Sequence, residues 1–145
     1  MRKDLTEIDL KQGLSVVIPF YNEAENTEKA LNSVIEAARS VSFPVEFILA
    51  NDGSTDGFPK PNLPQGVVFL NLIHSGRIAT RLAGARHAKY PNVLFIDARV
   101  WIHERSLQNL DQLLKRIPNA RFWNGYVESL HKNLPQVSIL SLIHI

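Results

Sequence analysis

Short apolar runs alternate along the chain with segments of helical spacing, and this alternation constrains the fold more than any other feature. Runs rich in Val, Ile, Leu and Phe predict buried strands at residues 14–19, 45–50, 67–73 and 93–97, with a further candidate at 121–127. Helical spacing follows at residues 24–40, at residues 77–88 and from Ser106 onward. Strands that alternate with helices predict an α/β fold, with a mostly parallel sheet and helices on both of its faces.

The helical segments also predict where each helix begins and which side chains face the core. Asn22 followed by Glu25 fits a capping box, so the first helix is expected to begin just after Asn22. The inward positions expected in the later helices are Ile78, Leu82 and Ala85, then Leu107, Leu110, Leu114 and Ile117.

Length and composition exclude several classes of protein. The 145 residues predict a single domain over residues 1–145. The 16 Lys and Arg residues and 14 Asp and Glu residues leave a net charge of +2, and scattered basic residues argue against a nucleic-acid partner. The chain has no cysteine, which excludes disulfides and thiolate zinc sites, and its 5 histidines lack paired ligand spacing. No metal site is therefore assigned.

The first residues and the hydropathy favour a cytoplasmic location. Acidic residues at the start, Asp4 and Glu7, stand where a signal peptide has its apolar stretch. No segment approaches the roughly 20 apolar residues of a membrane span. We therefore expect a cytoplasmic domain that associates with a membrane only through a missing remainder of the protein.

Acid-bearing segments follow three of the predicted strands. They are residues 21–23, Asn51 with Asp52, and Asp97. Ligands of parallel α/β sheets bind beyond the carboxyl ends of the strands, so these segments predict one polar ligand site. The first strand is followed by neither a Gly-x-Gly-x-x-Gly nor a P-loop sequence, which argues against a dinucleotide dehydrogenase and a P-loop enzyme.

Three segments resemble the N-terminal, nucleotide-binding part of the family 2 glycosyltransferases, which have the GT-A fold, a Rossmann-like sheet. They are residues 14–26, residues 45–57 with their Asn-Asp-Gly-Ser-Thr-Asp turn, and residues 76–84 leading into the strand that ends at Asp97. The resemblance covers residues 14–103. It implies transfer of a sugar from a nucleotide-diphosphate sugar, most commonly a UDP-sugar, to a hydroxyl of a carbohydrate or lipid-linked acceptor.

The resemblance also implies roles for individual residues. Asp52 matches the acid that holds the nucleobase, because a carboxylate accepts hydrogen bonds from a base N–H. The loop that lines the base and ribose corresponds to Pro19, Tyr21 and Glu23. Asp97 matches the first acid of the Asp-x-Asp signature, near the ribose and diphosphate. On the helix beside the pocket, Arg81 matches a family arginine.

The signature departs from the family at its last acid, which in relatives binds Mg²⁺ or Mn²⁺. Here the segment reads Asp97-Ala-Arg99, and a guanidinium repels a divalent cation. In one interpretation Arg99 replaces the metal as a fixed cation on the diphosphate. In the alternative interpretation the chain is a non-catalytic nucleotide-sugar-binding module that has lost its metal site.

The region after the signature predicts no catalytic residue. Family members take their general base from an acceptor half further along, and Glu104, Asp111 and Glu128 match no such motif. We therefore expect an incomplete GT-A domain in which residues 104–145 begin a truncated remainder, and which does not turn over alone. Residues 135–145 show no evident partner and have the character of a non-native tail.

Overall fold

A computed structural model describes residues 8–58, 63–117, 119–120, 122–125 and 140–144 of the chain. Within these ranges its elements are η1 (Leu10–Gln12), β1 (Leu14–Phe20), α1 (Ala24–Ala38), β2 (Val45–Asn51), β3 (Val67–Asn71), α2 (Arg77–Arg86), β4 (Asn92–Ile96), α3 (Ser106–Arg116), β5 (Phe122–Gly125) and β6 (Leu140–His144).

The strands form one sheet in the order β3-β2-β1-β4-β6-β5. β1 pairs in parallel with β2 and with β4, and β2 pairs in parallel with β3. β6 lies antiparallel to both β4 and β5. The predicted α/β fold with a mostly parallel sheet is therefore confirmed, and β1 lies between the two strands whose ends carry Asp52 and Asp97.

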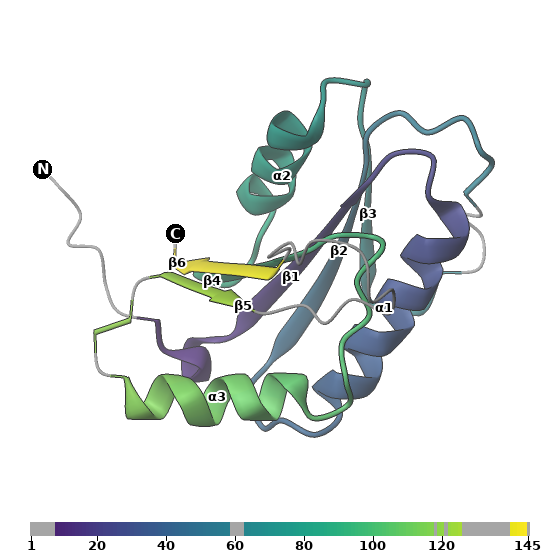
Figure 1. Cartoon of the computed structure of the whole chain (residues 1–145). Coiled ribbons are helices and arrows are strands. Elements are labelled where there is room, and N and C mark those ends of the chain that lie inside the picture. The colour runs from purple at the N-terminus through teal and green to yellow at the C-terminus, as the bar shows by residue number, and fades with distance from the viewer. Residues whose placement is uncertain (1–7, 59–62, 118, 121, 126–139, 145) are drawn as a thin grey trace, which may run out of the picture.

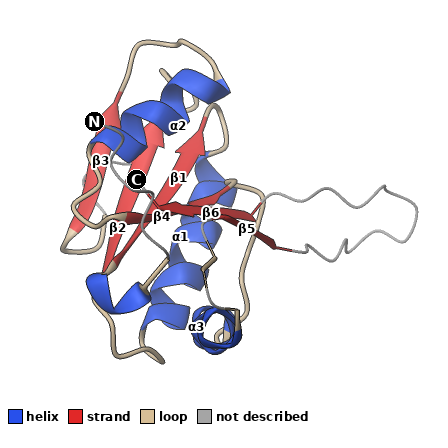
Figure 2. Cartoon of the chain, turned by 90° about the vertical axis from the view of Figure 1, so that its left-hand side faces the viewer, coloured by secondary structure: helices blue, strands red, loops and turns tan. Residues whose placement is uncertain are grey.

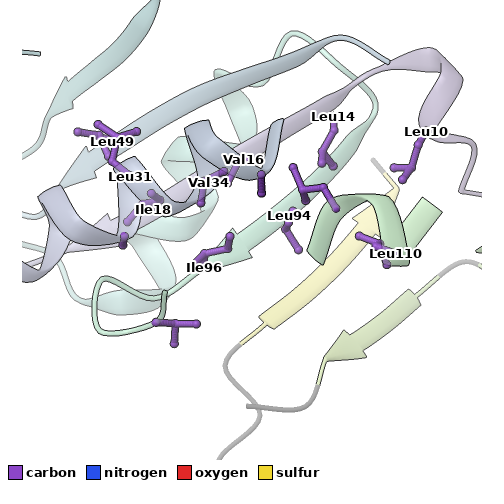
Figure 3. Close-up of a cluster of buried hydrophobic side chains, with 14 of the residues drawn as sticks. Leu10, Leu14, Val16, Ile18, Leu31, Val34, Leu49, Leu94, Ile96 and Leu110 are labelled. Atoms are coloured by element: carbon purple, nitrogen blue, oxygen red, sulfur yellow. The ribbon is translucent and has the colours of Figure 1, made fainter. Parts of the chain in front are cut away.

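Helices cover both faces of the sheet, as predicted. α2 lies on one face, and α1 and α3 lie on the other (Figures 1 and 2). Side chains alternate along β1, so Val16 and Ile18 face α1 while Val17 faces α2. The larger core gathers the apolar side chains of β1, β4, α1 and α3, among them Leu31 and Leu110 (Figure 3).

α2 sits close to the sheet because a glycine faces β1. A Cβ at Gly84 would lie 2.4 Å from Cγ1 of Val17. The helix buries only Thr80 and Gly84. The predicted inward positions Ile78 and Leu82 are wrong, since they are 84% and 48% exposed. Small residues bring the helix down onto β1, and this turns its larger apolar side chains outward.

α3 follows the prediction more closely. Leu107, Leu110 and Leu114 are buried as expected, whereas Ile117 is 46% exposed because the helix ends at Arg116 and the chain turns extended. The helix begins at Ser106, where helical spacing begins in the sequence, and its N-cap is Arg105.

β6 corrects the expectation that residues 135–145 have no partner. Residues Leu140–His144 pair antiparallel with β4 along its whole length, with Asn92 opposite His144 and Ile96 opposite Leu140. The pairing covers the edge of β4 that β1 leaves open, and such a long-range partner leaves no local signal in the sequence. In the described part of the chain, no helix is long and apolar enough to cross a membrane.

The Gly84 contact generates a stability prediction. We expect Gly84→Ala to lower the free energy of unfolding by about 1–3 kcal/mol, because the added methyl overlaps Val17 and forces α2 off the sheet. The exposed Ile78→Ala on the same helix is the control and should change it by less than about 0.5 kcal/mol. Urea unfolding followed by circular dichroism measures both, and equal effects would contradict the described seating of α2.

Candidate functional site

The site lies where parallel strands end. β1, β2 and β4 are adjacent and parallel, so the segments that follow them emerge at one edge of the sheet. α2 begins at the same edge, after the chain leaves β3 (Figure 1). The acid-bearing segments predicted from the sequence therefore surround the ends of neighbouring strands.

Hydrogen bonds join the loop after β1 to the loop after β2. The Asn22 N–H donates to Ser54 Oγ at 2.9 Å, and the Thr55 N–H donates to Asn22 Oδ1 at 2.8 Å. Asn22 adopts a φ of 50°, a left-handed conformation that asparagine tolerates better than most residues. The two loops therefore form one surface.

The predicted capping box at Asn22 is wrong, because the contact between the two loops uses the Asn22 side chain. α1 begins at Ala24, as expected, but its N-cap is Glu23, with no side-chain cap hydrogen bond. The Asn22 side chain is used by Thr55 instead. The Ala24 N–H donates to Asp56 Oδ2 at 2.8 Å, so a residue from the second loop satisfies the start of the helix.

Asp52 is buried beneath the start of α2. Only 4% of the residue is exposed, and its carboxylate accepts hydrogen bonds from the N–H groups of Ser75 at 2.7 Å and Gly76 at 3.0 Å. Burial works to raise the pKa of Asp52, but hydrogen bonds from Ser75, Thr80 and Gly76 outweigh it and hold the pKa below its ordinary value. Asp52 is thus an anion that anchors α2.

His74 contacts both Asp52 and Tyr21. Its Nδ1 makes a 3.0 Å hydrogen bond with the main-chain oxygen of Asp52 and lies 3.0 Å from Asp52 Oδ2. Its ring lies against the Tyr21 ring, with centroids 4.4 Å apart. His74 has no role predicted from the sequence, because no spacing rule connects it to Asp52. A carboxylate has about four lone-pair sites, and the N–H groups of Ser75 and Gly76 occupy two of those of Asp52. The Asp52 carboxylate can therefore accept a further N–H, and the His74 side chain beside it is 59% exposed.

Arg81 of α2 and Asp97, which follows β4, form an ion pair on the face of the sheet that α2 covers. Nη2 of Arg81 lies 2.6 Å from Oδ1 of Asp97. Burial raises the pKa of Asp97 above its ordinary value, and the charges of Arg81 and Arg77 offset only part of this. Arg77 and Arg81 are one turn apart and share a flank of α2. Nε of Arg81 is buried and has no acceptor among the described residues.

Glu23 and Arg99 form the second ion pair of the site. Nε of Arg99 donates to Glu23 Oε1 at 2.6 Å, and Nη2 donates to the same oxygen. The other Glu23 oxygen accepts a 2.7 Å hydrogen bond from Nδ2 of Asn26. The hydrogen bond from Arg99, followed by that from Asn26, lowers the pKa of Glu23. This pair joins the segments that follow β1 and β4.

The side chains at the signature positions do not suit the binding of a divalent cation. Of the two signature positions, Asp97 is engaged by Arg81, and Arg99 places a positive charge where an acid would be needed. Within the described ranges no three His, Asp or Glu side chains gather closely enough to hold a metal ion. A hard cation needs several oxygen ligands, which these residues do not supply.

Of the predicted site residues, Asp52 alone lines the cavity described at this edge. The cavity has a volume of about 220 Å³ and is lined by Asp52, Leu72, Ile73, Ser75, Ala79, Thr80 and Ala83. Ala79 and Ala83 lie on the flank of α2 opposite Arg77 and Arg81. The other predicted site residues lie outside this cavity lining. Pro19 is half-buried in β1, beside Ala50 of β2. The structure pairs Glu23 with Arg99 and Arg81 with Asp97, and places Tyr21 near Asp52 through His74.

The Asp52 contacts predict a measurable contribution to stability. We expect Asp52→Asn to lower the free energy of unfolding at pH 7 by about 1–3 kcal/mol, since the amide cannot accept from both Ser75 and Gly76. The folded-state pKa is lowered, so this contribution is complete above about pH 4 and is lost as the pH falls through the folded value.

Urea unfolding of wild type and variant between pH 2 and pH 7 measures this prediction, as a difference that shrinks toward low pH. Asp111→Asn, which breaks the surface pair with Lys115, is the control and should cost less than about 0.5 kcal/mol. A difference between wild type and Asp52→Asn that stays constant with pH would contradict the assigned charge of Asp52.

The sequence is similar to named glycosyltransferases. It is 31% identical over 117 residues to undecaprenyl-phosphate 4-deoxy-4-formamido-L-arabinose transferase of Edwardsiella ictaluri, which covers 75% of this chain and 34% of that protein. It is 24% identical over 102 residues to glycosyltransferase GlyA of Streptococcus pneumoniae, which covers 67% of this chain and 14% of that protein. The chain thus spans about a third or less of the length of these relatives.

The fold is similar to solved glycosyltransferase structures. The mannosyltransferase PcManGT from Pyrobaculum calidifontis, in complex with GDP-Man and Mn²⁺, matches 90% of this chain and 44% of its own, with a TM-score of 0.67 and 18% identity. TarS 1-349 of S. aureus in complex with UDP matches 71% of this chain and 32% of its own, with a TM-score of 0.57 and 24% identity. These similarities confirm the predicted GT-A-like fold.

The family model described as glycosyl transferase family 2 matches residues 15–132, well over half of the chain. This range contains all of the segments on which the predicted resemblance rests except Leu14, and every residue of the two ion pairs. The chain therefore belongs to glycosyl transferase family 2.

Proposed function

We propose that residues 14–103 bind the nucleotide-diphosphate sugar of an enzyme that transfers the sugar to an acceptor hydroxyl, with a UDP-sugar as donor. The observation that carries this proposal is the convergence of three segments on one edge of the sheet. Glu23 follows β1, Asp52 follows β2 and Asp97 follows β4, and ion pairs join the first and last of these segments to Arg99 and Arg81.

In this proposal Asp52 binds the nucleobase beside His74, and Pro19 and Tyr21 line the base. Asp97 binds on the ribose or diphosphate side. Arg81 and Arg99 face the diphosphate, where guanidinium groups suit phosphate oxygens in both charge and geometry.

The named relatives support the classes of donor and acceptor. TarS has been solved with UDP and with UDP-GlcNAc, and PcManGT with GDP-Man and Mn²⁺. The name of the Edwardsiella ictaluri transferase includes undecaprenyl phosphate, a lipid phosphate. We extend to this chain a nucleotide-diphosphate sugar as donor and a carbohydrate or lipid-linked acceptor.

The charged side chains at the two signature positions, Asp97 and Arg99, further favour nucleotide binding without a divalent cation. The chain supplies its own positive charge at Arg99, at the position that the family resemblance assigns to a metal-binding acid in relatives. The same observation favours the second candidate function, a nucleotide-sugar-binding module without turnover, because Asp97 is already engaged by Arg81. Both functions require the nucleotide site, and they differ only in whether the sugar is transferred to an acceptor.

Calorimetric titration of the 145-residue chain with UDP and GDP, in EDTA and in Mn²⁺, tests the proposal. We expect UDP to bind more tightly than GDP and its affinity to change by less than about threefold between EDTA and Mn²⁺. Asp52→Asn should weaken UDP binding by about tenfold or more, because the base loses its charged acceptor.

Asp111→Asn, on the surface of α3, is the matched control and should bind UDP as wild type does. Equal weak binding of UDP and GDP, unaffected by Asp52→Asn, would contradict the nucleotide site. Binding that appears only with Mn²⁺ would contradict the role proposed for Arg99.

A further inference from the structure

Arg99 is an exposed side chain whose position depends on one carboxylate. Its side chain is 76% exposed, and its hydrogen bonds within the described residues are both made to Oε1 of Glu23. A long arginine side chain in solvent samples many rotamers. The contact with Glu23 therefore determines where this guanidinium lies.

Glu23 is well placed to act as the fixed partner. Its side chain is only 18% exposed, and Asn26 donates to its second oxygen at 2.7 Å. Its backbone carbonyl accepts from both the N–H and the Oγ1 hydroxyl of Thr27, within the first turn of α1. The carboxylate is thus held by a helix, whereas the arginine is held by the carboxylate.

The geometry of the pair leaves Arg99 able to bind an anion. A guanidinium has five N–H donors. Glu23 Oε1 accepts hydrogen bonds from the N–H of Nε and from one N–H of Nη2, which lie on the same edge of the guanidinium plane. The Nη1–Nη2 edge keeps its two-donor fork, the arrangement that binds a phosphate through two parallel hydrogen bonds.

We propose that Glu23 is a positioning residue, which holds Arg99 so that its open edge binds the diphosphate of the nucleotide-diphosphate sugar. This inference rests on the proposed function and changes the role of Glu23, which the resemblance assigned to the base and ribose. Glu23 acts through Arg99 and makes no contact with the nucleoside.

The test compares a ligand that has phosphates with one that has none. Calorimetric titrations with UDP and with uridine are made on wild type, Glu23→Gln, Arg99→Gln and the double variant. We expect Glu23→Gln to weaken UDP binding by about tenfold and to leave uridine binding within about twofold, because only the phosphate contact depends on Arg99. Adding Glu23→Gln to Arg99→Gln should have no further effect.

Two further variants keep the test independent of folding defects. Glu25→Gln breaks the neighbouring exposed pair with Lys29, two residues along the chain, and should bind UDP as wild type does. Asn26→Ala removes the support of the second Glu23 oxygen and should weaken UDP, but not uridine, by about threefold. Circular dichroism verifies that each variant is folded.

Four other results would each overturn the inference. Tighter UDP binding by Glu23→Gln would show that Glu23 competes with the phosphates for Arg99. Equal weakening of UDP and uridine would show that Glu23 contacts the nucleoside. An Arg99→Gln variant that binds UDP normally while Asp52→Asn does not would remove Arg99 from the site but leave the proposed function standing. A wild-type chain that binds neither UDP nor GDP would overturn both proposals.

Discussion

The buried carboxylate of Asp52 is the interaction on which the rest of the site depends. It accepts the N–H groups of Ser75 and Gly76, and so joins the end of β2 to the start of α2. Negative charge at a helix N-terminus is favourable, and burial strengthens the interaction. Because this contact and Gly84 seat α2 on the sheet, the flank of the helix that carries Arg81 faces Asp97 at the end of β4.

Positive charge at this edge is supplied by the chain itself. Arg81 and Arg99 each pair with a carboxylate from another segment, and both pairs are partly open to solvent. Solvent-exposed pairs contribute little to stability, so Arg99, whose side chain is 76% exposed, is better understood as a positioned charge than as a support of the fold. Unlike a bound cation, a guanidinium stays charged and in place whatever the metal concentration.

Local signals in the sequence predicted the strands, the helices, the parallel sheet and the edge at which the polar residues gather. They failed where a partner lies far along the chain. Asn22 matched a capping box, but Thr55 of another loop takes its side chain. Ile78 has core spacing, yet Gly84 turns α2 so that it faces solvent. His74 and the pairing of β6 with β4 carry no local pattern at all.

The central claim is that segments from three strand ends form one nucleotide site. Titration of the ¹⁵N-labelled chain with UDP, followed by amide chemical shifts, tests it most directly. The account predicts that the largest shifts cluster at residues 21–24, 51–56, 74–81 and 97–100, at one edge of the sheet. Shifts confined to one of these segments, or centred on the opposite ends of the strands near Gly13 and Asn92, would contradict it.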